Sequence, residues 1–308
     1  MNRIGTTLAA LTLTLTAAPA FADGLAVRTA KLSPAARASL AAEIAADRKA
    51  RPDSYRAVFE VRGIQPEVYL KYQNPKPNAA HELRAMGASA LLPMLSALAF
   101  DGPSAVLTDP QRAALTVGML EAVGLLRDPR SGPVLSAALE SGTTDAQVLR
   151  AAAEALGRLC GDADLSALTR HAVFTDPLHQ AAVHGLGQCR RVEAAKHLGG
   201  LLATAPDDAT TELVAGALGT IGSSWAWKAL GPSVAATGLA VREIAARALV
   251  SAFPLRSPAA RQRIGVAMML VEHPVLPELL SRAHAEAPAE LRGEILTLKT
   301  RIERALAH

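Results

Sequence analysis

The chain has 308 residues, of which 50% are hydrophobic but only 3% aromatic, with 32 basic and 28 acidic side chains. Its apolar content is mostly Ala, Leu and Val, which favours closely packed helices over a sandwich of aromatic-rich strands. The net charge is +4 and the charged residues are spread evenly along the chain, which excludes a nucleic-acid-binding surface.

The first 22 residues are typical of a cleaved secretory signal. Arg3 supplies the positive charge, Ile4–Ala18 is an uncharged apolar run, and Ala20-Phe21-Ala22 forms an A-x-A cleavage site. A transmembrane anchor is the weaker alternative, because the run is short for a bilayer and rich in Thr. We therefore expect a periplasmic or secreted protein, with the signal cleaved after Ala22 and no stable membrane insertion.

Residues 23–78 are expected to form an N-terminal helical cap. Ser33-Pro34 provides an N-cap and a first-turn proline, and the helix that they begin should run to about Ala50. Beyond it, Tyr55, Val58 and Phe59 have helical spacing. The VFEV and VYLKY stretches would also suit a small β-hairpin.

From about residue 111 a pattern of about 30 residues repeats along the chain. Gly124, Gly157, Gly187 and Gly219 anchor four copies, and Val250 holds the same position in a fifth, at spacings of 33, 30, 32 and 31 residues. Mostly apolar residues stand nine, six, five, two and one positions before each anchor, which is the stripe of one amphipathic helix. A second helix should follow in each unit, around the pairs Val134-Leu135, Ala167-Leu168, His197-Leu198 and Ala229-Leu230.

The recurring Ala-Leu-Gly triplet, seen at 155–157 and 217–219, has an explanation in helix packing. Ala allows neighbouring helices to approach to about 8 Å, Leu fills the space between layers, and Gly ends the helix or permits close contact. The triplet itself carries no chemistry.

Three stretches resemble known repeats. VLRAAAEALGRLCGDADLSALTRHA (148–172) and VREIAARALVSAF (241–253) resemble HEAT repeats of the short bacterial kind also found in phycobilisome-lyase proteins, and AAHELRAMGASALLPMLSALAF (79–100) resembles another HEAT style. The resemblance implies an all-α fold: a right-handed α-solenoid of antiparallel helix pairs, about five to six HEAT-like repeats with helical end caps. We expect the solenoid over 79–270 and a C-terminal helical cap over 271–308, closed by a helix at Ala289–Ala307.

Cys160 and Cys189 are the only cysteines, and an even count in an exported chain favours a disulfide. They are 29 residues apart, nearly one repeat, so they should lie at similar heights on adjacent first helices. A bridge would need Cα atoms about 6 Å apart. Two buried thiols are the alternative.

Four of the eight histidines fall within about one repeat length: His171, His179, His184 and His197. His179 and His184 are five residues apart, so they do not share a helix face, and no His-Glu-x-x-His motif accompanies them. Deoxyhypusine hydroxylases, which are HEAT-type enzymes, bind iron with several His-Glu pairs, whereas this chain has only His81-Glu82 and the reversed pair Glu272-His273. We therefore predict no metal, no cofactor and no catalytic residue.

Trp225 and Trp227 lie in a turn between the helices of one unit, where large aromatic side chains are typical interface anchors. Packing against the solenoid edge is the alternative for both. With His171 and His197 they are the candidate interface residues. We predict a non-catalytic exported scaffold whose solenoid surface binds a protein of the cell envelope. The alternative is a HEAT-type enzyme, or a metal- or cofactor-binding protein of the lyase or hydroxylase type, that uses the His-rich middle repeats.

Overall fold

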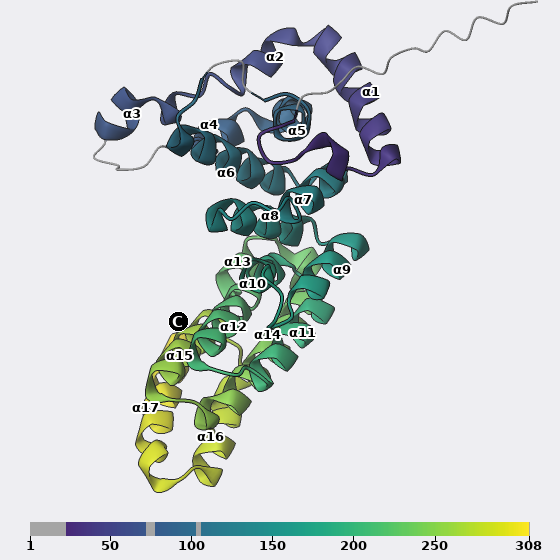
Figure 1. Ribbon diagram of the computed structural model, residues 1–308. Helices are drawn as coiled ribbons and strands as arrows, with labels where there is room; N and C mark the ends of the chain where they lie inside the picture. Colours follow the sequence, from purple (N-terminus) through teal and green to yellow (C-terminus); the bar gives the residue numbers. More distant parts are fainter. Residues whose placement is uncertain (1–22, 72–77, 103–105, 308) are drawn as a thin grey trace, which may run out of the picture.

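The computed structural model describes residues 23–71, 78–102 and 106–307. All regular elements in this part of the chain are helical, and they form an elongated array from α1 (Pro34–Ala50) at one end to α17 (Ala289–Leu306) at the other (Figure 1). The predicted all-α solenoid is confirmed. The predicted signal at 1–22 lies outside the described residues, and none of the helices within them is long and apolar enough to span a membrane.

Two layers of helices run along the array, one built from the first helix of each pair and one from the second. The first layer contains α4 (Ala80–Ala85), α6 (Asp109–Leu126), α8 (Ala146–Leu159), α10 (His179–Gln188), α12 (Asp208–Ile221), α15 (Pro258–Val271) and α17. The second contains α5 (Leu91–Ala99), α7 (Gly132–Leu139), α9 (Asp162–His171), α11 (Val192–Ala203), α14 (Ala235–Ala252) and α16 (Leu276–Glu286). Contacts between the layers join α8 to α7 and α9, α10 to α9 and α11, and α12 to α11 and α14. At the end of the array, α17 packs against α16.

The fifth copy of the repeat differs from the prediction. α14, which contains Val250, packs against α11 in the second layer, and α15 stands beside α12 in the first. A Cβ on Gly219 would lie 3.1 Å from the Cα of Ala267 in α15, so Gly219 contacts α15 as the earlier anchors contact their neighbours. Ala229-Leu230 does not begin a second helix either, because the short α13 (Ser224–Lys228) and a turn are inserted before α14.

The N-terminal cap is helical where it is described. The Ser33 side chain accepts a hydrogen bond from the backbone N–H of Ala36 and begins α1, as predicted. α2 (Pro52–Ala57) and α3 (Pro66–Lys71) follow, with a 3₁₀ turn between them. The hairpin alternative is therefore wrong for the described part of 51–78.

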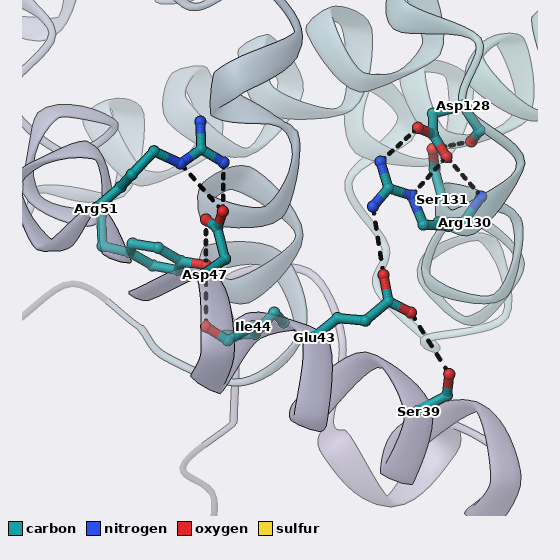
Figure 2. Close-up of polar contacts among 9 residues, drawn as sticks. Ser39, Glu43, Ile44, Asp47, Arg51, Asp128, Arg130 and Ser131 are labelled. Carbon is teal, nitrogen blue, oxygen red and sulfur yellow. Dashed lines mark hydrogen bonds and ion pairs between the residues drawn. The ribbon is translucent and has the colours of Figure 1, made fainter. Parts of the chain in front are cut away.

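Polar contacts of α1 fasten this cap to itself and to the solenoid (Figure 2). The Tyr55 hydroxyl donates to the Asp47 carboxylate over 3.0 Å and joins α2 to α1. Glu43 forms an ion pair with Arg130 at 3.3 Å, and Arg130 is in turn held by Asp128 at 2.7 Å in the turn after α6. The cap is thus tied by charge to the first units of the solenoid.

Small residues bring the first-layer helices into backbone contact. A Cβ on Gly124 would lie 2.6 Å from the Cα of Ala155, and one on Gly157 would lie 1.9 Å from the carbonyl oxygen of Gly185. At the C-terminal ends of α8 and α10, Cys160 and Cys189 form a disulfide, with Cα atoms 5.4 Å apart. Packing thus explains the recurring glycines, and a covalent link joins α8 to α10.

Candidate functional site

The clustered histidines do not converge on a metal site. His171 lies 2.9 Å from Asp176 through Nδ1 and 3.1 Å from Glu140 through Nε2, so it ties the end of α9 to the loop before α10 and to the end of α7. Within the described residues, no group of three or more His, Cys, Asp or Glu is placed to hold a metal ion. His171 is therefore a link between neighbouring units.

The two carboxylates control the charge of His171. Burial alone would lower the pKa of its imidazole, but the hydrogen bonds with Asp176 and Glu140 outweigh burial and raise the pKa above its ordinary value. Because the pKa is higher in the folded state, protonation of His171 stabilises the fold. This stabilisation is fully present at pH values below the unfolded-state pKa of about 6.5. This stabilisation is lost as the pH rises through the folded-state pKa.

We expect His171→Gln to cost more stability in mild acid than in mild base, because the lost interaction is that of the imidazolium. The test is urea unfolding of both proteins from about pH 5.5 to about pH 8, compared at each pH. Comparing the two proteins at each pH removes the contributions of His179 and His197 to the pH dependence of stability, because both proteins contain them. Burial lowers the pKa values of these two histidines. A difference that stays constant or widens with rising pH would contradict the assignment.

The other predicted interface residues differ in their exposure. Trp225 is 80% exposed, whereas Trp227 is only 6% exposed and packs into the core. His197 is half-buried, and its Nε2 is buried without a hydrogen-bond partner among the described residues. Of the four candidates, only Trp225 therefore presents a large exposed side chain to a partner.

Both His-Glu pairs have structural roles. The Glu82 carboxylate accepts hydrogen bonds from the backbone N–H groups of Arg62 (2.8 Å) and Gly63 (2.6 Å). Glu272 is hydrogen-bonded to the Ser224 hydroxyl, and the buried His273 accepts from the Val275 backbone at 3.1 Å. These carboxylates and His273 are engaged by protein groups.

A different set of side chains lines up across the first layer. Glu121, Glu154 and His184 each stand three positions before their anchor glycine, so the repeat places them at the same height on α6, α8 and α10. A second row stands seven positions before the same glycines. We define the polar groove as these two rows with Gln147: Val117, Glu121, Gln147, Arg150, Glu154, Gln180 and His184.

Two adjoining cavities make up the polar groove. One, of about 290 Å³, lies between α6 and α8, and the other, of about 310 Å³, lies between α8 and α10. Gln147 and Arg150 line both cavities. Each cavity is close to the lower end of the range for small-molecule sites.

Arg150 is the central cation of the groove. Its Nε donates to Glu154 over 2.8 Å, while its terminal amino groups make no hydrogen bond with the described residues. Arg158 also contacts Glu154, at 3.3 Å, so this carboxylate is already shared by two guanidinium groups. Because the side chain of Arg150 is 58% exposed, its free amino groups are available to an anionic ligand.

Burial shifts the two outer titratable groups in opposite directions. Burial raises the pKa of Glu121, and nearby Glu154 adds to the rise against the opposing charge of Arg158. Burial lowers the pKa of His184, and the charge of Arg150 lowers it further. The Glu121 carboxyl therefore keeps its proton to a higher pH than a free glutamate, and the His184 imidazole loses its proton at a lower pH than a free histidine. Opposite shifts of this kind are found at acid–base sites.

In the repeat, Glu121, Arg150, Glu154 and Gln180 stand between the apolar positions, so the pattern alone predicts a solvated face for them. The register of the repeat does indicate the grouping, because residues at equal offsets from successive anchor glycines lie together on neighbouring helices. From the sequence, His184 stands out only as one of four histidines that lie close together along the chain. The cavity that it lines is shared with Gln147 and Arg150 of the preceding unit.

Comparisons with known proteins give a limited result. A scan against protein-family models gave no match, and neither did a search of curated proteins. Solved structures do match, among them that of human deoxyhypusine hydroxylase in complex with glycerol. That match covers 83% of this chain and 96% of the other, at 17% sequence identity and a TM-score of 0.34.

The match contradicts our prediction of a non-catalytic scaffold that is not an enzyme, because the matched protein is an enzyme. At this identity and TM-score, no residue role, metal or substrate of that enzyme is carried over to the present chain.

Proposed function

We propose that this protein is a HEAT-repeat enzyme that binds a small carboxylate-bearing substrate in the polar groove and exchanges protons with it. The observation that carries the proposal is the alignment of Glu121, Glu154 and His184 on three successive helices around the free amino groups of Arg150. Side chains from three units line two cavities that share Gln147 and Arg150, which supports a binding site centred on Arg150.

Arg150 is the anchor for the substrate carboxylate. A guanidinium group offers a planar pair of donors that matches a carboxylate, and Glu154 already orients this one. Leu149, Pro177 and Ala181 give the cavity between α8 and α10 an apolar wall. A substrate that fits therefore has a carboxylate at one end and an apolar body.

Glu121 and His184 are the proton-transfer groups. His184, whose pKa is lowered, accepts one proton from the substrate, and Glu121, whose pKa is raised, donates one back, so the substrate keeps its charge while a proton changes position. Solvent returns both groups to their starting states. This chemistry needs neither a metal nor a redox cofactor.

Benzoate and benzamide test the binding step, because they share shape and differ in charge. We expect benzoate to bind with a Kd on the order of 1 mM or lower and to raise the pKa of His184, followed by NMR of labelled histidine. Benzamide should bind at least tenfold more weakly. Arg150→Gln should abolish the difference, whereas the control Arg247→Gln, which breaks an exposed pair with Glu243 on α14, should keep it. Equal binding of the two probes would refute the anchor.

The catalytic step is tested with phenylpyruvate, whose enol form becomes the keto form when C3 gains a proton and the hydroxyl loses one. We expect the protein to accelerate this conversion, and Glu121→Gln and His184→Gln each to slow it by about a hundredfold or more. Benzoate binding should survive both substitutions. Equal rates for the native protein and both variants would reject the proton-transfer assignment while leaving the anchor standing.

A further inference from the structure

The segment 222–234 departs from the repeat, because it inserts α13 and a 3₁₀ turn (Pro232–Val234) between α12 and α14. It also carries both tryptophans of the chain. The Nε1–H of Trp227 donates to the Ile221 carbonyl over 2.7 Å, and the Arg190 guanidinium lies 5.7 Å from the centre of its ring. The insertion is therefore firmly anchored to the end of α12.

A cavity of about 390 Å³ opens between α13 and α14. Its apolar lining comes from Trp227, Pro232, Ala235 and Leu239. Gly238 contributes by its lack of a side chain, since a Cβ there would lie 2.8 Å from Cε3 of Trp227. The space is large enough for a small ligand and lies outside the polar groove.

Two cations flank this apolar space. Arg242 is fixed by a hydrogen bond from Nε to the Val271 carbonyl (3.0 Å) and a second from Nη2 to the Glu272 carbonyl. Lys228 is exposed and has no ion pair with the described residues. The Glu272 carboxylate is engaged by the Ser224 hydroxyl. An apolar wall with two cations at its edge complements a molecule with an aliphatic chain and an anionic head.

We infer that the cavity between α13 and α14 is a second ligand site, which binds a medium-chain aliphatic carboxylate. The chain lies against Trp227, Ala235 and Leu239, and the carboxylate faces Lys228 and Arg242. This inference does not depend on the polar groove. Leu239, which is 49% exposed, gains cover when the site is occupied, and burial of the aliphatic chain supplies the main driving force.

Intrinsic fluorescence reports on this site alone, because Trp225 and Trp227 are the only tryptophans. Trp225→Phe leaves Trp227 as the single reporter. We expect decanoate, below its micelle concentration, to change the Trp227 emission saturably, and hexanoate to bind at least tenfold more weakly. Decyltrimethylammonium, with the same chain length and the opposite charge, should give no saturable change at the same concentrations.

Variants locate the site. Lys228→Glu should weaken decanoate binding at least tenfold, and Ala235→Phe, which fills the cavity, should abolish it. The control Lys196→Glu changes an exposed lysine on α11 and should leave binding unchanged. Circular dichroism checks that each variant folds. Equal responses to decanoate and decyltrimethylammonium, or an unchanged decanoate response in Ala235→Phe, would overturn the inference. Binding to phosphatidylglycerol vesicles without decanoate binding would also overturn it and indicate a lipid surface instead.

Discussion

Replacing Gly157 with alanine should lower the free energy of unfolding by about 3 kcal/mol or more, although alanine is the better helix former. The new Cβ would lie 1.9 Å from the carbonyl oxygen of Gly185 and 2.8 Å from its carbonyl carbon. Both are backbone atoms of α10, so no side chain can rotate away and the two helices must separate. The helix-propensity gain of about 1 kcal/mol is too small to offset that separation.

Gly200→Ala is the matched control, because Gly200 also lies inside a helix, α11, but has open space where its Cβ would be. This substitution should stabilise the protein by about 0.5–1 kcal/mol through helix propensity alone. Unfolding in urea measures both changes. Hydrogen exchange should place the loss in Gly157→Ala at α8 and α10, because repeat arrays can unfold in parts. Stabilisation by both alanines would show that α8 and α10 are not in backbone contact.

The fold could be predicted because each helix records its buried stripe in the sequence. The offsets before Gly124, Gly157, Gly187 and Gly219 mark nine-residue stretches that have one apolar side, and all four stretches belong to the first layer. The prediction for the fifth copy is wrong because α14 and α15 both have an apolar stripe. A periodic pattern does not show which layer a helix joins. The insertion of α13 shifted the alternation of layers, and the spacing of 31 residues from Gly219 to Val250 concealed the shift.

The polar groove was harder to predict for a physical reason. Periodicity separates buried positions from exposed ones, and Glu121, Arg150 and Glu154 all fell on the exposed side. Their chemistry depends on partial burial between neighbouring helices, which sets the pKa of Glu121 and His184 and is a property of the assembled layers. Equal offsets from the anchor glycines indicate that Glu121, Glu154 and His184 lie close together. They do not indicate how the pKa values of Glu121 and His184 shift.

Removing the disulfide should destabilise the protein by about 3–4 kcal/mol, the value that the chain-entropy model gives for the 29-residue separation of Cys160 and Cys189. The double variant Cys160→Ser, Cys189→Ser and the native protein under a reducing agent should agree in urea unfolding. Reducing agent should leave the double variant unchanged, which controls for any other effect of the reagent.

The consequences of reduction should be local. Gly157 and Gly185 still hold the helix contact without the covalent link, so the reduced protein should fold and lose hydrogen-exchange protection mainly in α8 and α10. These two helices also line the cavity that contains Arg150 and His184, so reduction should weaken benzoate binding there and leave decanoate binding at α13 unchanged. Equal stability of the oxidised and reduced proteins would show that the bond contributes nothing. A disulfide with this effect persists in an oxidising compartment, which is where the N-terminal sequence predicts that the protein is exported.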